Sequence, residues 1–325
     1  MIILNLIILA AGFWALIKGA DIFVDGSAAL AGNFKVPALI IGLTIVALGT
    51  SAPELAVSTA ASIQGSNEIA LSNVVGSNIF NLLCVLGVCA IICPVPVDRG
   101  ILKRDFPLSI LSTMFVLLAA GGTRLLGRTM GGSGMEAVAG AVGRLSGALL
   151  IAVFIGYIGY LVYDAKKNPD RAESGKHVPV WKCILLIIMG LALIVGGGQA
   201  VVCGAKEIAR AAGMTETLIG LTVVAVGTSL PELVTSVVAA KKGQTELAVG
   251  NVIGSNIFNL MFILGISAVI DPVAVNVASV YDLLILVSVS ILTLLFSFTS
   301  GKIGRIEGGI MIALYAADVV FAILR

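Results

Sequence analysis

The chain has 325 residues, of which 58% are hydrophobic and only 12% are charged, about half the charged share of an ordinary soluble domain. A soluble protein this apolar would lack polar surface, and the formal net charge of +2 is too small to indicate a nucleic-acid partner. We therefore expect a membrane protein whose surroundings are the lipid bilayer.

Apolar stretches of about 20 residues, the length that crosses a bilayer core, recur along the chain. They are continuously apolar rather than alternating, which predicts helices and not a barrel. The predicted fold class is an all-α membrane protein with ten transmembrane helices. The predicted spans are 2–24, 36–62, 68–92, 106–122, 146–164, 180–210, 216–240, 246–269, 280–298 and 305–324.

The distribution of basic residues predicts the orientation of these spans. With ten spans, both termini lie on one side of the membrane. The loops opposite the termini hold 13 of the 20 Lys and Arg residues, and the terminal side holds six; Lys18 lies within the first span. Because Lys and Arg gather in cytoplasmic loops, we expect a multi-pass protein of the cell (inner) membrane with both termini outside.

The chain contains an internal repeat. Residues 42–58 read GLTIVALGTSAPELAVS and residues 220–236 read GLTVVAVGTSLPELVTS, so residue 42 corresponds to residue 220, a shift of 178. The same shift relates GSNEIALSNVVGSNIFNLLCVLG at 65–87 to GQTELAVGNVIGSNIFNLMFILG at 243–265. Such self-similarity indicates two copies of one structural unit.

A second match, with a shift of 161, relates GRLSGALLIAVF at 143–154 to GRIEGGIMIALY at 304–315. The 17 extra residues of the first copy predict an elongated external loop within 121–142. Five spans form one repeat, and five is odd, so the second copy enters the membrane from the opposite side. The predicted domains are residues 1–163 as the first five-helix repeat, 164–179 as a cytoplasmic hinge and 180–325 as the second, inverted repeat.

Each repeat carries a glutamate inside an apolar span, Glu54 and Glu232, in a shared GTSxPE motif. An ionised residue at the bilayer centre costs roughly 2.5–3.5 kcal/mol on insertion scales, so such residues usually face a polar cavity. Glutamates that are protonated or paired between helices are the alternative. Pro53 and Pro231 remove a backbone donor, which predicts a broken helix beside each glutamate.

Oxygen-bearing side chains accompany both glutamates at helical spacing. Close packing of small residues would explain any single Ser, but not two matching sets. Carboxylates, hydroxyls and amide oxygens without thiolates or imidazoles favour a hard cation, Ca²⁺ in particular, and Na⁺ accepts similar ligands. The two sets are Thr50, Ser51, Ser77 and Asn81 with Glu54, and Thr228, Ser229, Ser255 and Asn259 with Glu232.

The paired blocks GTSAPE…GSNIFN and GTSLPE…GSNIFN closely resemble the α-repeats of the calcium:cation antiporter superfamily, the sodium/calcium exchangers, here of prokaryotic type. The resemblance implies exchange of several Na⁺ for one Ca²⁺ by alternating access, without a cofactor, in a chain that functions as a monomer. It adds the backbone carbonyls of Ala47 and Ala225 to the ten side chains above as cation ligands. Some relatives, including potassium-dependent ones, carry Asp where this chain has Asn259, so obligatory K⁺ co-transport is not expected.

Other functions stay open at this point. A proton/calcium exchanger of the same fold would use a glutamate that titrates, and a passive cation channel would need weaker or multiple sites. An enzyme is not expected, because the sequence has no nucleotide loop, no metal–His motif and no nucleophile–base pair.

Asp21 and Asp25, near the end of the first span, are expected in a solvated interfacial position, with an entry vestibule as the alternative. We expect the first and sixth helices to slide during transport. Close contact would be allowed by glycines at 12, 19, 26, 196, 197, 198 and 204.

Overall fold

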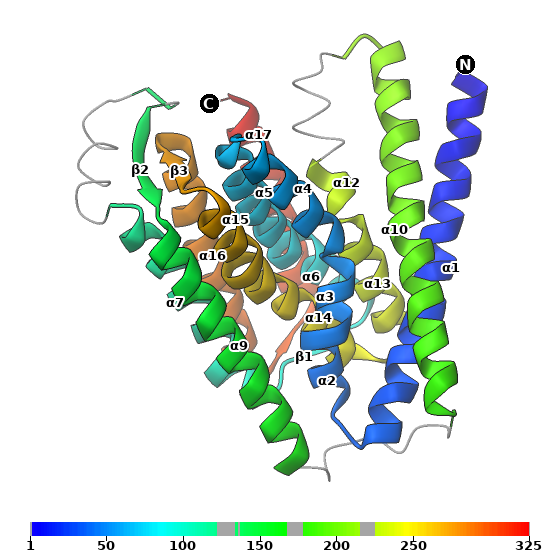
Figure 1. Cartoon of the computed structure of the whole chain (residues 1–325). Helices are drawn as coiled ribbons and strands as arrows, with labels where there is room; N and C mark the ends of the chain where they lie inside the picture. The colour runs from blue at the N-terminus through cyan, green and yellow to red at the C-terminus, as the bar shows by residue number, and fades with distance from the viewer. Residues whose placement is uncertain (1, 122–133, 136, 168–177, 215–224, 325) are drawn as a thin grey trace. The chain divides into compact units, whose positions relative to one another are not determined.

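The structure is a computed structural model that describes residues 2–121, 134–135, 137–167, 178–214 and 225–324 (Figure 1). The chain forms two compact units, the first made of Met1–Pro53 with Tyr163–Gly254 and the second of Glu54–Val162 with Ser255–Arg325. Each unit therefore combines segments of both sequence repeats. Most of the predicted hinge, residues 168–177, lies outside the described residues.

The first unit is built on two long helices, α1 (Ile2–Phe34) and α10 (Val180–Ala211), which lie side by side (Figure 1). Glycines allow the close approach: a Cβ built on Gly19 would lie 2.8 Å from the carbonyl oxygen of Gly190. Gly12 meets Gly197 in the same way. The contact partner of Gly12 is Gly197 and that of Gly19 is Gly190, so the two helices run antiparallel. The unit also contains α2 (Ala38–Ile41), the π-helical segment η1 (Gly42–Val46), α3 (Ala47–Thr50), α12 (Ala225–Thr228), α13 (Leu230–Lys241) and most of α14 (Thr245–Ile257).

The structure of this unit differs from two of the sequence expectations. α1 continues to Phe34 rather than ending near residue 24. Two of the glycines expected to allow close contact make none that is tight. A Cβ built on Gly196 has no atom within 4 Å, and a Cβ built on Gly198 lies 3.8 Å from the Pro231 ring. The glycines at 12, 19 and 26 contact α10 itself, so the tight contact joins the two long helices to each other.

The helix break predicted beside each proline is present in both repeats. α3 ends at Thr50, and α4 (Ala52–Ile63) continues after a bend of 49° at Ser51. In the second repeat Ser229, with φ −93° and ψ 6°, separates α12 from α13. Because Pro has no N–H and its ring displaces the carbonyl of the preceding turn, the helix cannot run straight through this position.

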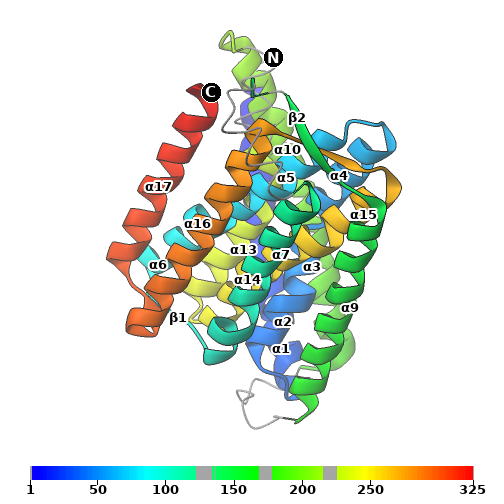
Figure 2. The same ribbon diagram turned by 90° about the vertical axis from the view of Figure 1, so that its left-hand side faces the viewer.

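The second unit is a helical bundle in which α16 (Val277–Ser300) packs against α7 (Phe106–Ala119) and α5 (Asn67–Phe80) (Figure 2). α17 (Arg305–Leu324) packs against α6 (Leu86–Ile92). Its other helical segments are most of α4, most of α9 (Arg144–Lys167), η2 (Asn81–Val85), η3 (Ile101–Asp105), η6 (Phe258–Ile263) and α15 (Leu264–Ile270).

Two short antiparallel ribbons in the second unit were not predicted. β1 (Val95–Pro96) pairs with β4 (Lys302–Ile303), and β2 (Val138–Val142) pairs with β3 (Val273–Asn276). β2 lies within the predicted elongated external loop and was not itself predicted; residues 122–133 and 136 lie outside the described residues. The two ribbons are equivalent between the repeats. Val95 of β1 corresponds to Val273 of β3 under the shift of 178, and Ala141 of β2 corresponds to Lys302 of β4 under the shift of 161.

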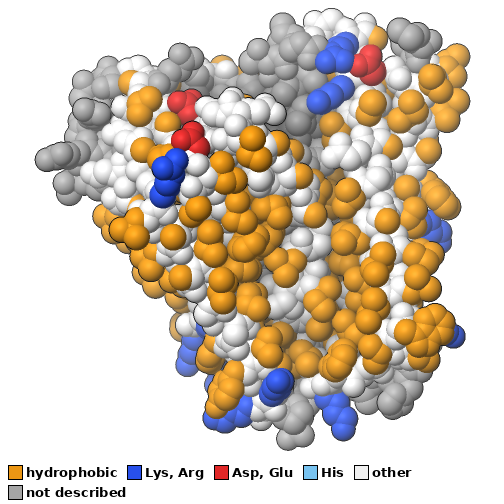
Figure 3. Space-filling view, viewed as in Figure 1, with side chains coloured by type: hydrophobic (Ala, Val, Ile, Leu, Met, Phe, Trp, Pro, Cys, Tyr) orange, Lys and Arg blue, Asp and Glu red, His pale blue; other side chains and the backbone are white. Residues whose placement is uncertain are grey.

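Among the described residues, seven helices are long and apolar enough to cross a membrane, or eight if the bent pair Ala38–Thr50 and Ala52–Ile63 is one span. Large apolar side chains such as Trp14 and Trp181 are more than 60% exposed. Figure 3 shows hydrophobic side chains over the visible surface of α10. Such a surface is stable in lipid rather than water, so the chain is a multi-pass membrane protein.

Candidate cation site

The first unit places Ser51 in direct contact with Glu232. The Ser51 hydroxyl, at the helix break of the first repeat, donates a 2.7 Å hydrogen bond to Oε1 of Glu232, in the first turn of α13. Ser51 is 0% and Glu232 1% exposed. A hydrogen bond to an ionised acceptor is stronger than a neutral one, and it partly replaces the water that the carboxylate lost on burial.

Asn251, on α14, holds the surroundings of Glu232 in place. Its Nδ2 donates to Ser236 Oγ at 2.9 Å and to the backbone carbonyl of Glu232 at 3.4 Å. Its Oδ1 accepts a 3.0 Å hydrogen bond from the Thr50 hydroxyl. Since all of these groups are buried, one amide fixes both the helix that carries the glutamate and the hydroxyl beside Ser51.

The second unit repeats part of this arrangement around Glu54, which is 0% exposed. Asn73 Nδ2 donates to Ser58 Oγ at 2.9 Å and to the Glu54 carbonyl at 3.3 Å. Asn73 corresponds to Asn251 and Ser58 to Ser236 under the shift of 178. The two glutamate helices are thus held by equivalent amide contacts.

Four buried amides form a second network in the second unit. Asn78 Nδ2 donates to the Asn256 carbonyl at 3.1 Å, and Asn256 Nδ2 donates to the Asn78 carbonyl at 3.2 Å. Asn81 Nδ2 donates to Asn256 Oδ1 at 3.1 Å, and Asn259 Nδ2 donates to Asn78 Oδ1 at 3.0 Å. Within the described residues, the Oδ1 atoms of Asn81 and Asn259 are buried without a hydrogen-bond partner.

Five of the remaining predicted ligands, Ala47 and four hydroxyl residues, are also buried. The Ala47 carbonyl accepts hydrogen bonds from the Ser51 N–H at 3.1 Å and from the Thr50 hydroxyl at 3.4 Å. In the second repeat the Ser229 N–H donates instead to the Val226 carbonyl, at 3.2 Å, and Ala225 begins α12. The other hydroxyls are between 0% and 8% exposed: Ser77, Thr228, Ser229 and Ser255.

Known proteins resemble this chain over nearly its whole length. The family model described as "Sodium/calcium exchanger protein" matches residues 4–163 and 182–324. The chain belongs to the sodium/calcium exchanger family. It is 35% identical to the sodium/calcium exchanger MaX1 of Methanosarcina acetivorans, over 98% of this chain and 99% of that protein. It is 32% identical to the inner membrane protein YrbG of Escherichia coli, over 87% of this chain and 86% of that one.

The fold agrees with this family. The solved structure of the sodium-calcium exchanger NCX_Mj soaked with 2.5 mM Na⁺ and 0.1 mM Ca²⁺ superposes with a TM-score of 0.81 at 33% identity, covering 98% of this chain and 99% of that one. Membership in the exchanger family makes the chain a transporter that carries out cation/Ca²⁺ antiport, and not an enzyme.

Sequence reasoning missed the four asparagines that organise these exchanger motifs: Asn73, Asn78, Asn251 and Asn256. The motifs SNVVGSNIFN and GNVIGSNIFN contain all of them, each repeated at the shift of 178. The i, i+4 spacing was applied only to Ser77 with Asn81 and to Ser255 with Asn259, although Asn73 and Asn251 continue the same spacing toward the N-terminus. The signal that identifies them is that every asparagine of one motif recurs in the other.

Asp21 and Asp25 are partly solvated, as expected, but they also share one basic partner. Lys242 Nζ lies 2.7 Å from Asp21 Oδ1 and 2.6 Å from Asp25 Oδ1. Burial alone would lower the pKa of Lys242, but the hydrogen bonds to the two aspartates outweigh it, and the pKa is raised. The ion pairs join α1 to the end of α13.

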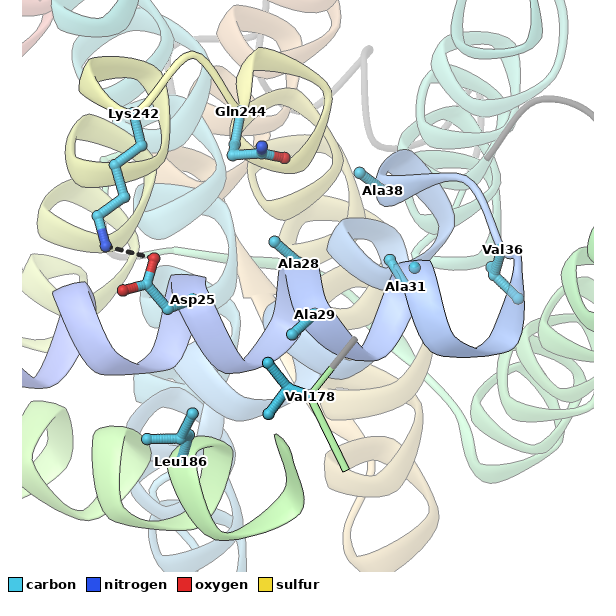
Figure 4. Close-up of a pocket in the computed structure, with 11 residues that line it drawn as sticks. Asp25, Ala28, Ala29, Ala31, Val36, Ala38, Val178, Leu186, Lys242 and Gln244 are labelled. Atoms are coloured by element: carbon cyan, nitrogen blue, oxygen red, sulfur yellow. Dashed lines mark hydrogen bonds and ion pairs between the residues drawn. The ribbon is translucent and has the colours of Figure 1, made fainter. Parts of the chain in front are cut away.

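The Asp25–Lys242 ion pair borders a cavity of about 560 Å³ in the first unit, shown in Figure 4. Asp25 points toward Lys242 at one end of the cavity, and alanines of α1 line the space beside it. Asp25 therefore lines a cavity, and the entry vestibule stays a prediction.

Proposed function

We propose that this chain exchanges Ca²⁺ for Na⁺ across the cell membrane at a site to which Glu54 and Glu232 both contribute. The observation that carries the proposal is the buried hydrogen bond from Ser51 to Glu232, which joins the GTS motif of one repeat to the glutamate of the other. A carboxylate kept in an apolar protein is costly unless a cation or donors compensate it. A cation bound beside the carboxylate during transport supplies that compensation.

The ligands proposed for this site are oxygen atoms only. Ca²⁺ accepts about 6–8 oxygens in flexible geometry, and two ionised carboxylates neutralise its charge. Na⁺ competes for the same oxygens, and competition at one site opened alternately to each side produces exchange. The proposed set is the carbonyls of Ala47 and Ala225 with the side chains of Thr50, Ser51, Glu54, Ser77, Asn81, Thr228, Ser229, Glu232, Ser255 and Asn259.

Inverted repeats are proposed as the basis of alternating access. The antiparallel packing of α1 and α10 supports this, because residues of α1 correspond to residues of α10 under the shift of 178, and equivalent helices that run in opposite directions are what inversion requires. The complete proposal has ten transmembrane helices divided at residues 164–179, a cytoplasmic hinge, both termini outside and a monomer as the functional form.

The driving ion is tested by ⁴⁵Ca²⁺ uptake into proteoliposomes. One set is loaded with Na⁺ and diluted into Na⁺-free buffer, and a second, free of Na⁺, receives an imposed pH gradient. We expect uptake in the first set only. Uptake in the second set alone would replace Na⁺ by H⁺ as the counter-ion, and rapid flux that needs no counter-ion would indicate a channel instead.

A further inference from the structure

Asn78 and Asn256 lie three residues before the proposed ligands Asn81 and Asn259, yet each of them contacts the ligand of the other repeat. Asn78, on α5, accepts from Asn259, and Asn256, on α14, accepts from Asn81. Each also donates to the backbone carbonyl of the other. The network is therefore crossed between repeats.

Hydrogen-bonding chemistry determines which way every amide in this network points. The Asn256 carbonyl can only accept, so Asn78 must face it with Nδ2. Asn78 Oδ1 is then on the other side, and because oxygen also only accepts, Asn259 must present Nδ2 to it. The oxygen of Asn259 consequently points away from the network. The same steps, with the repeats exchanged, orient Asn81.

We propose that Asn78 and Asn256 are positioning residues that turn the amide oxygens of Asn259 and Asn81 toward the transported cation. The inference rests on the proposed function, because it takes Asn81 and Asn259 as cation ligands. An unrestrained amide can rotate so that its NH₂ group replaces its oxygen, and the NH₂ group repels a cation. The crossed network removes that orientation in both repeats.

A purely structural role would not explain where the network stops. Asn81 Oδ1 and Asn259 Oδ1 are buried and have no hydrogen-bond partner among the residues that the structure describes. A buried acceptor without a partner destabilises a fold. Both oxygens are on the ligand residues, one in each repeat, which is where a cation would complete the network.

The test is a double-mutant cycle read by equilibrium ⁴⁵Ca²⁺ binding to the purified full chain in detergent. We expect Asn78→Ala to weaken Ca²⁺ binding about tenfold. In an Asn259→Ala background the same change should weaken binding less than about twofold, because the residue through which it acts is gone. In an Asn81→Ala background it should keep its full effect. Asn256→Ala should show the opposite pattern.

Thr293→Val serves as the control for burial, because Thr293 is buried in α16 and donates only within its own helix, to the Val289 carbonyl at 2.8 Å. It should leave Ca²⁺ binding unchanged. Equal losses in both backgrounds, or no loss from Asn78→Ala, would overturn the inference.

Binding also separates this inference from the proposed function. A wild-type chain that binds Ca²⁺ but does not exchange it for Na⁺ contradicts the proposed function, and the crossed pattern still decides the role of Asn78. A wild-type chain that binds no Ca²⁺ overturns both.

Discussion

The Ser51 hydroxyl donates a 2.7 Å hydrogen bond to Oε1 of Glu232, although the two residues are 181 positions apart in the chain. The contact means that the helix break of the first repeat and the carboxylate of the second act on each other. A change at the break therefore alters a hydrogen bond to the Glu232 carboxylate.

Ser51→Ala should raise the KM for Ca²⁺ in exchange by about tenfold or more, since a hydrogen bond to a charged group contributes about 1.5–3 kcal/mol. Initial rates of ⁴⁵Ca²⁺ uptake measure this. Ser290→Ala is the matched control, because Ser290 is equally buried and donates to its own helix. An unchanged KM in Ser51→Ala would show that the Ser51–Glu232 bond does not affect the site.

Asn251→Ala should lower the melting temperature in detergent more than Asn73→Ala does. Asn251 satisfies Thr50, Ser236 and the Glu232 carbonyl, and leaving buried polar groups without partners costs about 1–3 kcal/mol each. Asn73 makes only two equivalent bonds and is half-buried. The opposite order of melting temperatures would contradict this description.

Gly190→Ala should destabilise the chain, because the new Cβ would lie 2.7 Å from the Phe23 backbone nitrogen and force α1 away from α10. Overpacking of this kind costs about 1–3 kcal/mol. Gly196→Ala, six residues later in the same helix, meets no atom within 4 Å and should be neutral or stabilising, since Ala favours helix. Thermal unfolding of the two variants, side by side, checks the packing; equal melting temperatures would refute it.

Crosslinking α1 to α13 should stop exchange if α1 slides during transport. The positions are Asp25 and Lys242, whose side chains are 2.6 Å apart and close one end of the cavity in Figure 4. We would combine Asp25→Cys with Lys242→Cys in a background lacking the five native cysteines and measure ⁴⁵Ca²⁺ uptake before and after treatment with a bis-methanethiosulfonate reagent, which spans the gap that the shorter side chains leave. We expect loss of uptake that a reductant reverses. Full uptake in the crosslinked protein would rule out sliding of α1 against α13.

The sequence predicted most of the helices, because unbroken apolar stretches of membrane length leave few alternatives. α10 begins at the predicted residue and ends one later, and α17 matches its predicted span. The predicted first span ends ten residues before α1 does, because Asp21 and Asp25 are charged residues typical of the end of a span. Their shared partner Lys242 lies 217 residues after Asp25, so the local sequence does not reveal it. The ribbons β1–β4 and β2–β3 were missed because their strands are short and pair distant segments.

The sequence predicts a set of candidate site residues but not the contacts between them. Repetition and helical spacing selected Glu54, Glu232 and their oxygen neighbours. Neither could show that Asn78 reaches Asn259 rather than Asn81, because that contact depends on the packing of α5 against η6, not on spacing along one helix. The ten-helix count and the inverted topology stay predictions, in part because residues 215–224 lie outside the described chain.

The most direct test of the proposed exchange is Na⁺-gradient-driven ⁴⁵Ca²⁺ uptake by Glu54→Gln and Glu232→Gln, compared with Glu68→Gln. Glu68 is an exposed glutamate in the first turn of α5, so its loss controls for the chemical change alone. We predict that both buried variants lose uptake, whereas Glu68→Gln retains the wild-type rate. Gradient-driven uptake that persists in either buried variant would contradict a transport site built on these two carboxylates.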